Sequence, residues 1–372
     1  MAGIYLHIPF CFKRCDYCDF YKTTNISLKT EFLKILEKEI ANSVPLIQKE
    51  TIETIYFGGG TPSVLTPDEV KNILDQIFTA AGRKKIKEIT FELNPDDGSK
   101  EYLKALKETG VNRLSIGIQS FDERLLKVLN RRHDAEQAKQ VVQNARQAGF
   151  ENISIDLMYG LPGMPEEVWK KSIDTALSMK VEHISAYHLT YEQGTVFYKK
   201  LEKGIFDVIS EEESIQQFKI LIDKLKRVGY EHYEISNFSL PGRRSMHNSN
   251  YWNGIKYFGF GPSAHSFDGK KRWWNISDIA NYLKGHFVES EEVLTETDRY
   301  NELVMLKLRT KEGIKVKELQ KSGSKYLRFF ENNVKKHISS GNVKYETGRY
   351  FVTEKGIFIS DYIISDLFYN YF

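Results

Sequence analysis

The chain has 372 residues, of which 41% are hydrophobic and 28% are charged, and its formal net charge is +3 at pH 7. These values are typical of a soluble globular protein with one large domain and a smaller one. A charge this close to neutral argues against nucleic acid as the main partner. No run of about 18 apolar residues occurs, so no transmembrane segment is expected. Free thiols and an N-terminus that enters a strand at once, without an export signal, predict a cytoplasmic protein.

Short β-rich segments alternate with longer helical patterns over most of the chain. The predicted strands are Gly3–Phe10, Thr51–Gly58, Glu88–Asn94, Arg113–Ser120, Asn152–Gly160, His183–Thr190 and Glu231–Phe238. The predicted helices are Leu28–Gln48, Pro67–Ala81, Asp134–Ala148, Pro165–Met179 and Glu211–Arg227. This alternation predicts an α/β fold with a parallel sheet, and the number of units favours a complete or partial barrel over an open sheet.

The three cysteines of the chain are Cys11, Cys15 and Cys18, in a C-x3-C-x2-C spacing that lets one loop surround a single metal centre. Tetrahedral zinc takes four ligands, and a cysteine-bound [4Fe–4S] cube takes one per iron, so one position remains for another ligand. An iron–sulfur cube with an open position suits catalysis. A structural zinc completed by His7, without a redox role, is the alternative. A disulfide would close only very small loops and leave one thiol over.

Polar side chains stand near the ends of three apolar strands, at Glu92, Gln119 and Asp156. In a barrel the C-terminal strand ends meet at one mouth, so these side chains are predicted to face a common site beside the cysteine loop. The run Gly58-Gly59-Gly60-Thr61-Pro62 follows the second strand and allows a ligand to approach the backbone closely. An ordinary strand-to-helix turn is the more common reason for such a run.

The segment Tyr5-Leu-His7-Ile-Pro9-Phe-Cys11, which leads into the cysteine loop and Tyr17, resembles the start of radical S-adenosylmethionine (SAM) proteins. More narrowly, it resembles the branch that holds oxygen-independent coproporphyrinogen III oxidases and the related HemW-type haem chaperones. The resemblance extends over most of the chain. It implies a partial (β/α)6 TIM-like radical SAM barrel, in which SAM chelates the fourth iron of a [4Fe–4S] cluster. Carried over by motif, the implied SAM site comprises Tyr5, Tyr17, Gly59, Gly60, Thr61, Glu92, Gln119, Arg131 and Asp156. Arg132 is predicted to be a solvated neighbour, and an exchange of roles between Arg131 and Arg132 is the alternative.

The string His247-Asn-Ser-Asn-Tyr251-Trp252 resembles the haem-binding signature of the chaperone branch. Imidazole is a common axial ligand of haem iron, and Tyr and Trp combine an apolar face with a polar tip. Taken alone, the six residues fit a structural histidine beside two aromatics better than a haem ligand. With the resemblance, His247 is the predicted haem ligand and Tyr251 and Trp252 shape the pocket. His265, in Gly-Phe-Gly-Pro-Ser-Ala-His265, is the second candidate.

Three regions are expected along the chain. Residues 1–239 form the radical SAM core with the cluster and SAM site, 240–295 connect and carry the haem motif, and 296–372 form a small helical, winged-helix-like domain. Winged helices often bind DNA, but they also serve as packing and interaction modules, and no nucleic-acid partner is expected here.

The resemblance implies two candidate functions. A haem chaperone would bind haem, a [4Fe–4S] cluster and SAM, and would pass haem to haem-dependent proteins, in the family often membrane respiratory enzymes. A coproporphyrinogen III oxidase would instead reduce SAM to a 5′-deoxyadenosyl radical, which abstracts a propionate hydrogen before decarboxylation. Two features favour the chaperone. Cys18 is followed by Asp19 and Phe20 without the fourth cysteine of the oxidases, and only ten residues precede Cys11, where the oxidases carry an extension that encloses the substrate.

Overall fold

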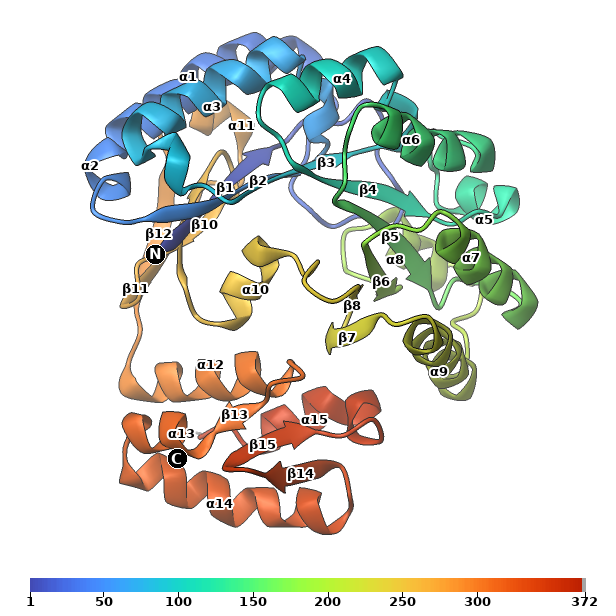
Figure 1. Ribbon diagram of the computed structural model, residues 1–372, viewed down its shortest axis with the longest axis vertical. Coiled ribbons are helices and arrows are strands. Elements are labelled where there is room, and N and C mark those ends of the chain that lie inside the picture. The colour runs from blue at the N-terminus through green and yellow to red at the C-terminus, as the bar shows by residue number, and fades with distance from the viewer. Residues whose placement is uncertain (370–372) are drawn as a thin grey trace.

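The computed structural model describes residues 1–369. Figure 1 shows a large α/β unit with a smaller, mainly helical unit below it, built from the C-terminal part of the chain. A short helix, α10 (Met246–Trp252), lies between the two units and packs against strands of the large one and against a helix of the small one.

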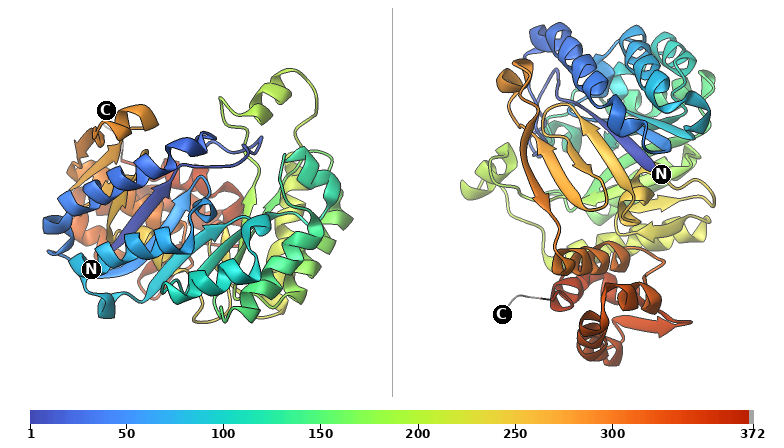
Figure 2. Two further views of the ribbon diagram at one scale, coloured as in Figure 1. Left: turned by 90° about the horizontal axis from the view of Figure 1, so that it is seen from above. Right: turned by 90° about the vertical axis from the view of Figure 1, so that its left-hand side faces the viewer.

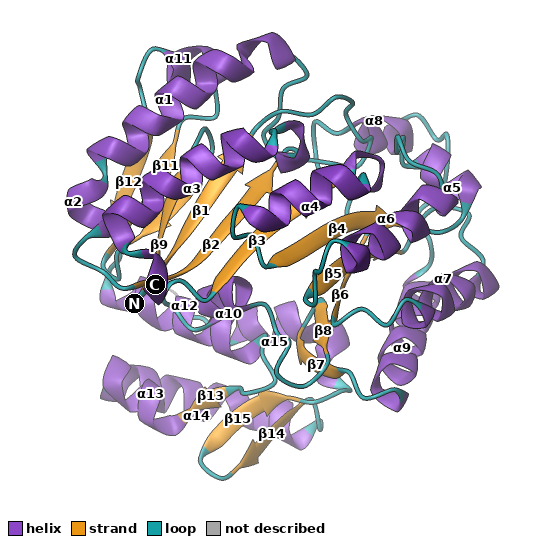
Figure 3. Ribbon diagram, turned by 45° about the horizontal axis from the view of Figure 1, so that its top comes forward, coloured by secondary structure: helices purple, strands orange, loops and turns teal. Residues whose placement is uncertain are grey.

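Six parallel strands form the centre of the large unit, and each is a neighbour of the next one in the chain. They are β1 (Ala2–Ile8), β2 (Ile52–Gly59), β3 (Glu88–Leu93), β4 (Arg113–Gln119), β5 (Ile153–Tyr159) and β6 (His183–His188). The helices that cover their outer face include α1 (Lys29–Asn42), α3 (Pro67–Ala81), α4 (Lys100–Glu108), α6 (Ala135–Gln147), α7 (Glu166–Ser178) and α9 (Glu211–Arg227). Figures 2 and 3 show the curved sheet inside its layer of helices, which confirms the predicted partial (β/α)6 barrel.

Alternation along each strand separates the core from the barrel interior. In β1, Ile4, Leu6 and Ile8 are fully buried beneath the helices, and the side chains between them, Tyr5 and His7, face the interior. The interior is therefore lined by polar and aromatic residues, whereas the apolar core lies between the sheet and the helices.

Two predicted elements are divided in the structure. The strand predicted over 231–238 is a hairpin of β7 (Glu231–Glu234) and β8 (Asn237–Ser239), and β8 pairs antiparallel with β6. The helix predicted over 28–48 ends at Asn42, and a separate turn of helix, α2 (Val44–Ile47), follows because Pro45 cannot continue the backbone ladder.

The region after residue 240 extends the same sheet beyond β1, which the sequence did not predict. It contributes β9 (Lys256–Phe260), β10 (His265–Phe267), β11 (Lys271–Asn275), α11 (Ile279–Leu283) and β12 (Val288–Val293). Strand β9 runs parallel to β1, and β10 to β12 follow as antiparallel neighbours, giving one sheet of 12 strands.

The C-terminal unit has a hydrophobic core of its own, which includes Tyr300, Val304, Phe330, Val334 and Ile363. Its elements are α12 (Glu296–Leu308), β13 (Ile314–Lys315), α13 (Val316–Ser322), α14 (Ser324–Ser339), β14 (Val343–Glu346), β15 (Arg349–Val352) and α15 (Ser360–Asp366). These four helices, with a three-stranded sheet in the order β13-β15-β14, give the expected winged-helix-like arrangement. Across residues 1–369, no helix is long and apolar enough to cross a membrane.

Candidate cofactor site at the barrel mouth

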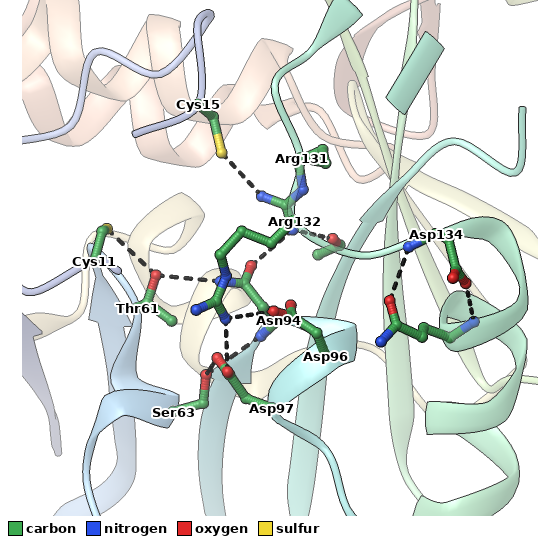
Figure 4. A network of polar contacts seen from close by, with 12 residues as sticks. Cys11, Cys15, Thr61, Ser63, Asn94, Asp96, Asp97, Arg131, Arg132 and Asp134 are labelled. Atoms are coloured by element: carbon green, nitrogen blue, oxygen red, sulfur yellow. Dashed lines mark hydrogen bonds and ion pairs between the residues drawn. The ribbon is translucent and has the colours of Figure 1, made fainter. Parts of the chain in front are cut away.

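The loop after β1 carries all three cysteines as free thiols, with Cys11 buried and Cys15 and Cys18 half-buried. Two of the sulfur atoms accept hydrogen bonds from residues at the barrel mouth (Figure 4). Thr61 Oγ1 donates to Cys11 Sγ (3.3 Å), and Arg131 Nη1 donates to Cys15 Sγ (3.2 Å). Donors aimed at sulfur stabilise thiolates, so this loop suits a thiolate-bound cluster.

Asn94, at the end of β3, links these two contacts into one path. Arg131 Nη2 donates to Asn94 Oδ1 (2.7 Å), and Asn94 Nδ2 donates to Thr61 Oγ1 (3.4 Å). A continuous set of hydrogen bonds therefore runs from Cys11 to Cys15 across the strand ends, as Figure 4 shows. Sequence reasoning missed Asn94, although it lies two residues after Glu92 and hence on the same face of the strand.

His7 does not turn towards the cysteines. Its Nε2 lies 2.9 Å from the carbonyl oxygen of Tyr21, and its Nδ1 lies 3.3 Å from the hydroxyl of Tyr5. Burial lowers the pKa of His7 to about 4, which keeps the ring neutral. The contacts of His7 thus give no support to the alternative of a zinc ion completed by this residue.

Position 59 in the glycine run requires glycine, because the His7 ring lies close to the backbone there. Its φ of 106° lies in the left-handed region, and a Cβ there would meet the His7 ring at 2.8 Å. At Gly60, a Cβ would come within 2.9 Å of the backbone of Pro9 and Phe10. The run therefore packs tightly against the segment that leads into the cysteine loop.

Glu92 and Asp156 face the barrel interior, half-buried, from β3 and β5. Tyr56, from β2, donates its hydroxyl to Glu92 Oε1 (2.7 Å), and Ser115 Oγ lies 3.4 Å from Asp156 Oδ1. Desolvation raises the pKa of Glu92 to about 7 and that of Asp156 to about 6. The buried guanidinium of Arg113 opposes both shifts. These carboxylates can accept hydrogen bonds from a bound ligand.

Gln119 and Tyr17 complete the predicted set. Gln119 ends β4 with a φ of 67°, and its Oε1 is buried without a hydrogen-bond partner among the described residues. A buried, unpartnered amide oxygen at the mouth fits a ligand that donates to it. Tyr17, in the cysteine loop, lies with its hydroxyl 3.5 Å from Arg131 Nη1.

Arg132 is not the solvated neighbour that the sequence predicted. Its guanidinium pairs with Asp96 (2.7 Å) and Asp97 (2.6 Å), and 23% of its side chain is exposed. Asp97 also accepts from Ser63 Oγ (2.6 Å). Arg132 therefore holds the turn after β3 and lies over the Phe12 ring of the cysteine loop (4.9 Å from the guanidinium carbon to the ring centroid), while Arg131 alone of the pair contacts a cysteine.

The residues of the haem motif lie on α10, at the N-terminal ends of the barrel strands. His247 is 1% exposed, and its ring nitrogens lie 2.9 Å from Thr54 Oγ1 and 2.9 Å from the Tyr251 hydroxyl. Tyr251 is half-buried and lines a cleft that also contains His265, whereas Trp252 is half-buried and is not among the residues that line this cleft. The prediction that His247 itself ligates haem iron remains untested, but both ring nitrogens have partners within the protein.

Comparison with known proteins places these observations in a family. The Radical SAM superfamily matches residues 5–176, and the HemN C-terminal domain matches residues 294–359. The heme chaperone HemW of Bacillus subtilis is 37% identical over 96% of this chain and 96% of its own. HemW of Lactococcus lactis is 35% identical over 95% of this chain and 93% of its own. Among solved structures, the coproporphyrinogen III oxidase HemN of Escherichia coli aligns with a TM-score of 0.84. It covers 99% of this chain and 90% of its own, at 23% identity.

The barrel and the cysteine loop are those of a radical SAM protein. At this identity and coverage, the chain belongs to the radical SAM superfamily, within the coproporphyrinogen III oxidase-like branch and with the HemW proteins. A [4Fe–4S] cluster and SAM are the cofactors of this superfamily, and the donor set at the barrel mouth fits both. The similarity to the oxidase structure, at 23% identity, shows the fold alone.

Proposed function

We propose that this protein is a cytoplasmic haem chaperone, which binds haem beside a [4Fe–4S] cluster and SAM and passes haem to haem-dependent proteins. One observation carries the proposal: relatives that match the chain almost end to end bear the name heme chaperone. Residues 1–239 would serve the cofactors, 240–295 would serve haem, and 296–372 would pack on the core without contacting nucleic acid. Respiratory haem enzymes at the membrane are the acceptor class that we propose.

In this proposal Cys11, Cys15 and Cys18 ligate three irons of the cluster. Burial raises the pKa of the Cys11 and Cys18 thiols, so both are protonated before iron binds and must lose the proton to do so. The hydrogen bonds from Thr61 and Arg131 then compensate part of the negative charge on sulfur.

SAM is proposed to lie in the barrel mouth, against Tyr5, Tyr17, Gly59, Gly60, Thr61, Glu92, Gln119, Arg131 and Asp156. Glu92 and Asp156 can accept from hydroxyl and amino groups, and the Arg131 guanidinium can meet a carboxylate. When bound, the cluster supplies electrons to SAM. The residues of the chain orient the ligand and exclude water from the strand ends.

Anaerobic reconstitution followed by iron, sulfide and zinc analysis tests the cluster assignment. We expect about four irons and four sulfides per chain, lost when any of the three cysteines is replaced by Ser. One zinc per chain in their place would restore the structural-zinc alternative.

Titration of SAM into the reconstituted Glu92→Ala and Asp156→Ala variants tests the SAM assignment. Neither residue lies in the cysteine loop, so we expect the cluster content to stay unchanged. SAM affinity should fall by about ten-fold or more, since a lost charged contact costs roughly 1.5–3 kcal/mol. Unchanged affinity in both variants would mean that SAM binds elsewhere.

The chaperone and oxidase functions are separated by their products. The reconstituted protein is given SAM, a strong reductant and coproporphyrinogen III under strict anaerobiosis, and in parallel haem and a haem-free acceptor protein. We expect haem transfer and no decarboxylation. Multiple-turnover formation of protoporphyrinogen IX would overturn the chaperone proposal in favour of the oxidase.

A further inference from the structure

His265, the first residue of β10, presents an imidazole that the protein does not use. It is exposed, and across residues 1–369 neither ring nitrogen has a hydrogen-bond partner. The ring stacks on Trp274, its partner in the β10–β11 ladder, with centroids 5.9 Å apart and planes at 25°. Partial burial, and then the positive charge of Arg272, lower the pKa of His265. The imidazole is therefore oriented, neutral at physiological pH and free to bind a metal.

His265 lies in a cleft of about 370 Å³ whose walls are largely aromatic. Phe20 and Tyr21 come from the cysteine loop, Tyr251 from α10 and Tyr257 from β9. Tyr251 and Tyr257 meet edge to face with centroids 4.7 Å apart. Phe20 is 63% exposed, so the cleft is open on that side. Aromatic walls with a few hydroxyl groups suit a flat, mostly apolar ligand, and an open side suits a ligand that is later handed on.

His247 reaches this cleft only through Tyr251. Its Nε2 holds the Tyr251 hydroxyl, its Nδ1 lies against Thr54 Oγ1, and a Cβ at Gly3 would come within 3.1 Å of the ring. The start of α10 is fixed as well, because the Glu88 carboxylate accepts from the backbone N–H groups of Met246 and His247 (both 2.9 Å). These contacts fix the position of His247 below the cleft. His247 therefore affects the cleft by placing the Tyr251 ring.

We propose that His265 supplies the protein ligand to haem iron, and that His247 is a positioning residue that acts by holding Tyr251 in the cleft wall. This inference rests on the proposed haem chaperone function, because haem is the flat, iron-containing ligand of that function. It divides the two histidines between two roles: an exposed ring without a partner binds iron, and a buried ring with two partners holds the wall.

The test is a haemin titration of the full-length reconstituted protein, followed by difference spectra in the Soret region and by EPR of the ferric haem. The variants are His265→Ala, His247→Gln, Tyr251→Phe and the double variant of the last two. His286→Ala serves as the matched control, because His286 is an exposed histidine that does not line the cleft. Circular dichroism and thermal melting identify variants that fold. If His247→Gln does not fold, Tyr251→Phe still removes the same contact.

We expect His265→Ala to shift the Soret maximum and to raise the Kd at least about ten-fold, and His286→Ala to change neither. His247→Gln and Tyr251→Phe should keep the wild-type Soret maximum and EPR signal and raise the Kd about two- to five-fold. The double variant should bind haemin no more weakly than either single variant. Both substitutions break the same contact, between His247 Nε2 and the Tyr251 hydroxyl. A Soret maximum and Kd unchanged in His265→Ala, or a ligand signal lost in His247→Gln, overturns the assignment. A wild-type protein that binds no haem contradicts the proposed function itself, before any variant is compared.

Discussion

Lys200 Nζ, on α8 (Val196–Glu202), lies 2.6 Å from Asp16 Oδ2, in the middle of the cysteine loop. The other carboxylate oxygen of Asp16 accepts from Asn130 Nδ2 (3.0 Å), and its backbone oxygen accepts from the Phe197 N–H (2.9 Å). Two segments far away in the sequence thus hold the residue that follows Cys15. Residues outside the cysteine loop therefore fix the shape of the loop that we propose to bind the cluster.

Replacing Lys200 by Met is expected to loosen this loop without removing a cysteine. The pair is partly exposed, with 34% of the Lys200 and 12% of the Asp16 side chain accessible, so its contribution is on the order of 1 kcal/mol. We expect the reconstituted variant to lose iron to a chelator about five-fold faster than wild type. Lys203→Met, an exposed change just after the same helix, is the control. Equal rates in all three proteins would show that the ion pair does not hold the loop.

Arg131→Lys is expected to impair SAM binding while the three cysteines keep the cluster. Arg131 contacts Cys15 Sγ and Asn94 Oδ1 through two different nitrogens, a geometry that a single ammonium group cannot reproduce. We expect SAM affinity to fall about ten-fold or more, and the EPR signal of the reduced cluster to shift.

Arg132→Lys is the matched control for this change. It alters the ion pairs with Asp96 and Asp97 and the contact with the Phe12 ring, and it leaves the contact between Arg131 and Cys15 in place. We expect SAM affinity within about two-fold of wild type. The roles of the two arginines would have to be exchanged if Arg132→Lys were the variant that loses SAM.

Glu92 is expected to make the stability of the SAM-free protein depend on pH. Desolvation raises its pKa from 4.5 to about 7, so folding favours the protonated form. Its stabilising contribution is complete below pH 4.5 and is lost as the pH rises through about 7, a change of at most ~3 kcal/mol. Urea denaturation at pH 5 and pH 8 should show a smaller loss of unfolding free energy in Glu92→Gln than in wild type. Equal losses would mean that Glu92 is not desolvated.

We expect Glu39 to stabilise the fold around the cleft that contains His265. This buried carboxylate of α1 accepts from the Gly261 N–H (2.9 Å), the Tyr282 hydroxyl (2.6 Å) and Asn275 Nδ2 (2.5 Å). Glu39→Ala removes an acceptor from all three donors, of which only Asn275 Nδ2 has a second one, the Gly261 carbonyl oxygen (2.8 Å), and should lower the unfolding free energy by about 3 kcal/mol or more. Urea denaturation measures this loss, and Glu37→Ala, exposed on the same helix, should change it by less than about 0.5 kcal/mol. Similar losses in both variants would contradict this role of Glu39.

The sequence by itself determined the elements of the barrel and the chemistry of its mouth. Apolar strands with a two-residue period and helices with apolar stripes are local patterns, so their positions could be predicted closely, as for the helix over 67–81. Strand order followed from the short connections of βα units. The cysteine spacing is local as well, because one loop must supply all three thiols.

Tertiary structure alone decided how distant side chains are used. Lys200 meets Asp16 across 184 positions, and His247 meets Thr54 across 193, and no local pattern encodes either pair. The motif singled out Arg131, but only the packing of the strand ends shows that it reaches Cys15 and that Arg132 pairs with Asp96 and Asp97. Likewise, His247 and His265 have the same imidazole, and burial decides which of them is free. A hydrogen-bond partner or a desolvated environment is a property of the assembled fold, and for that reason it could not be predicted from the chain alone.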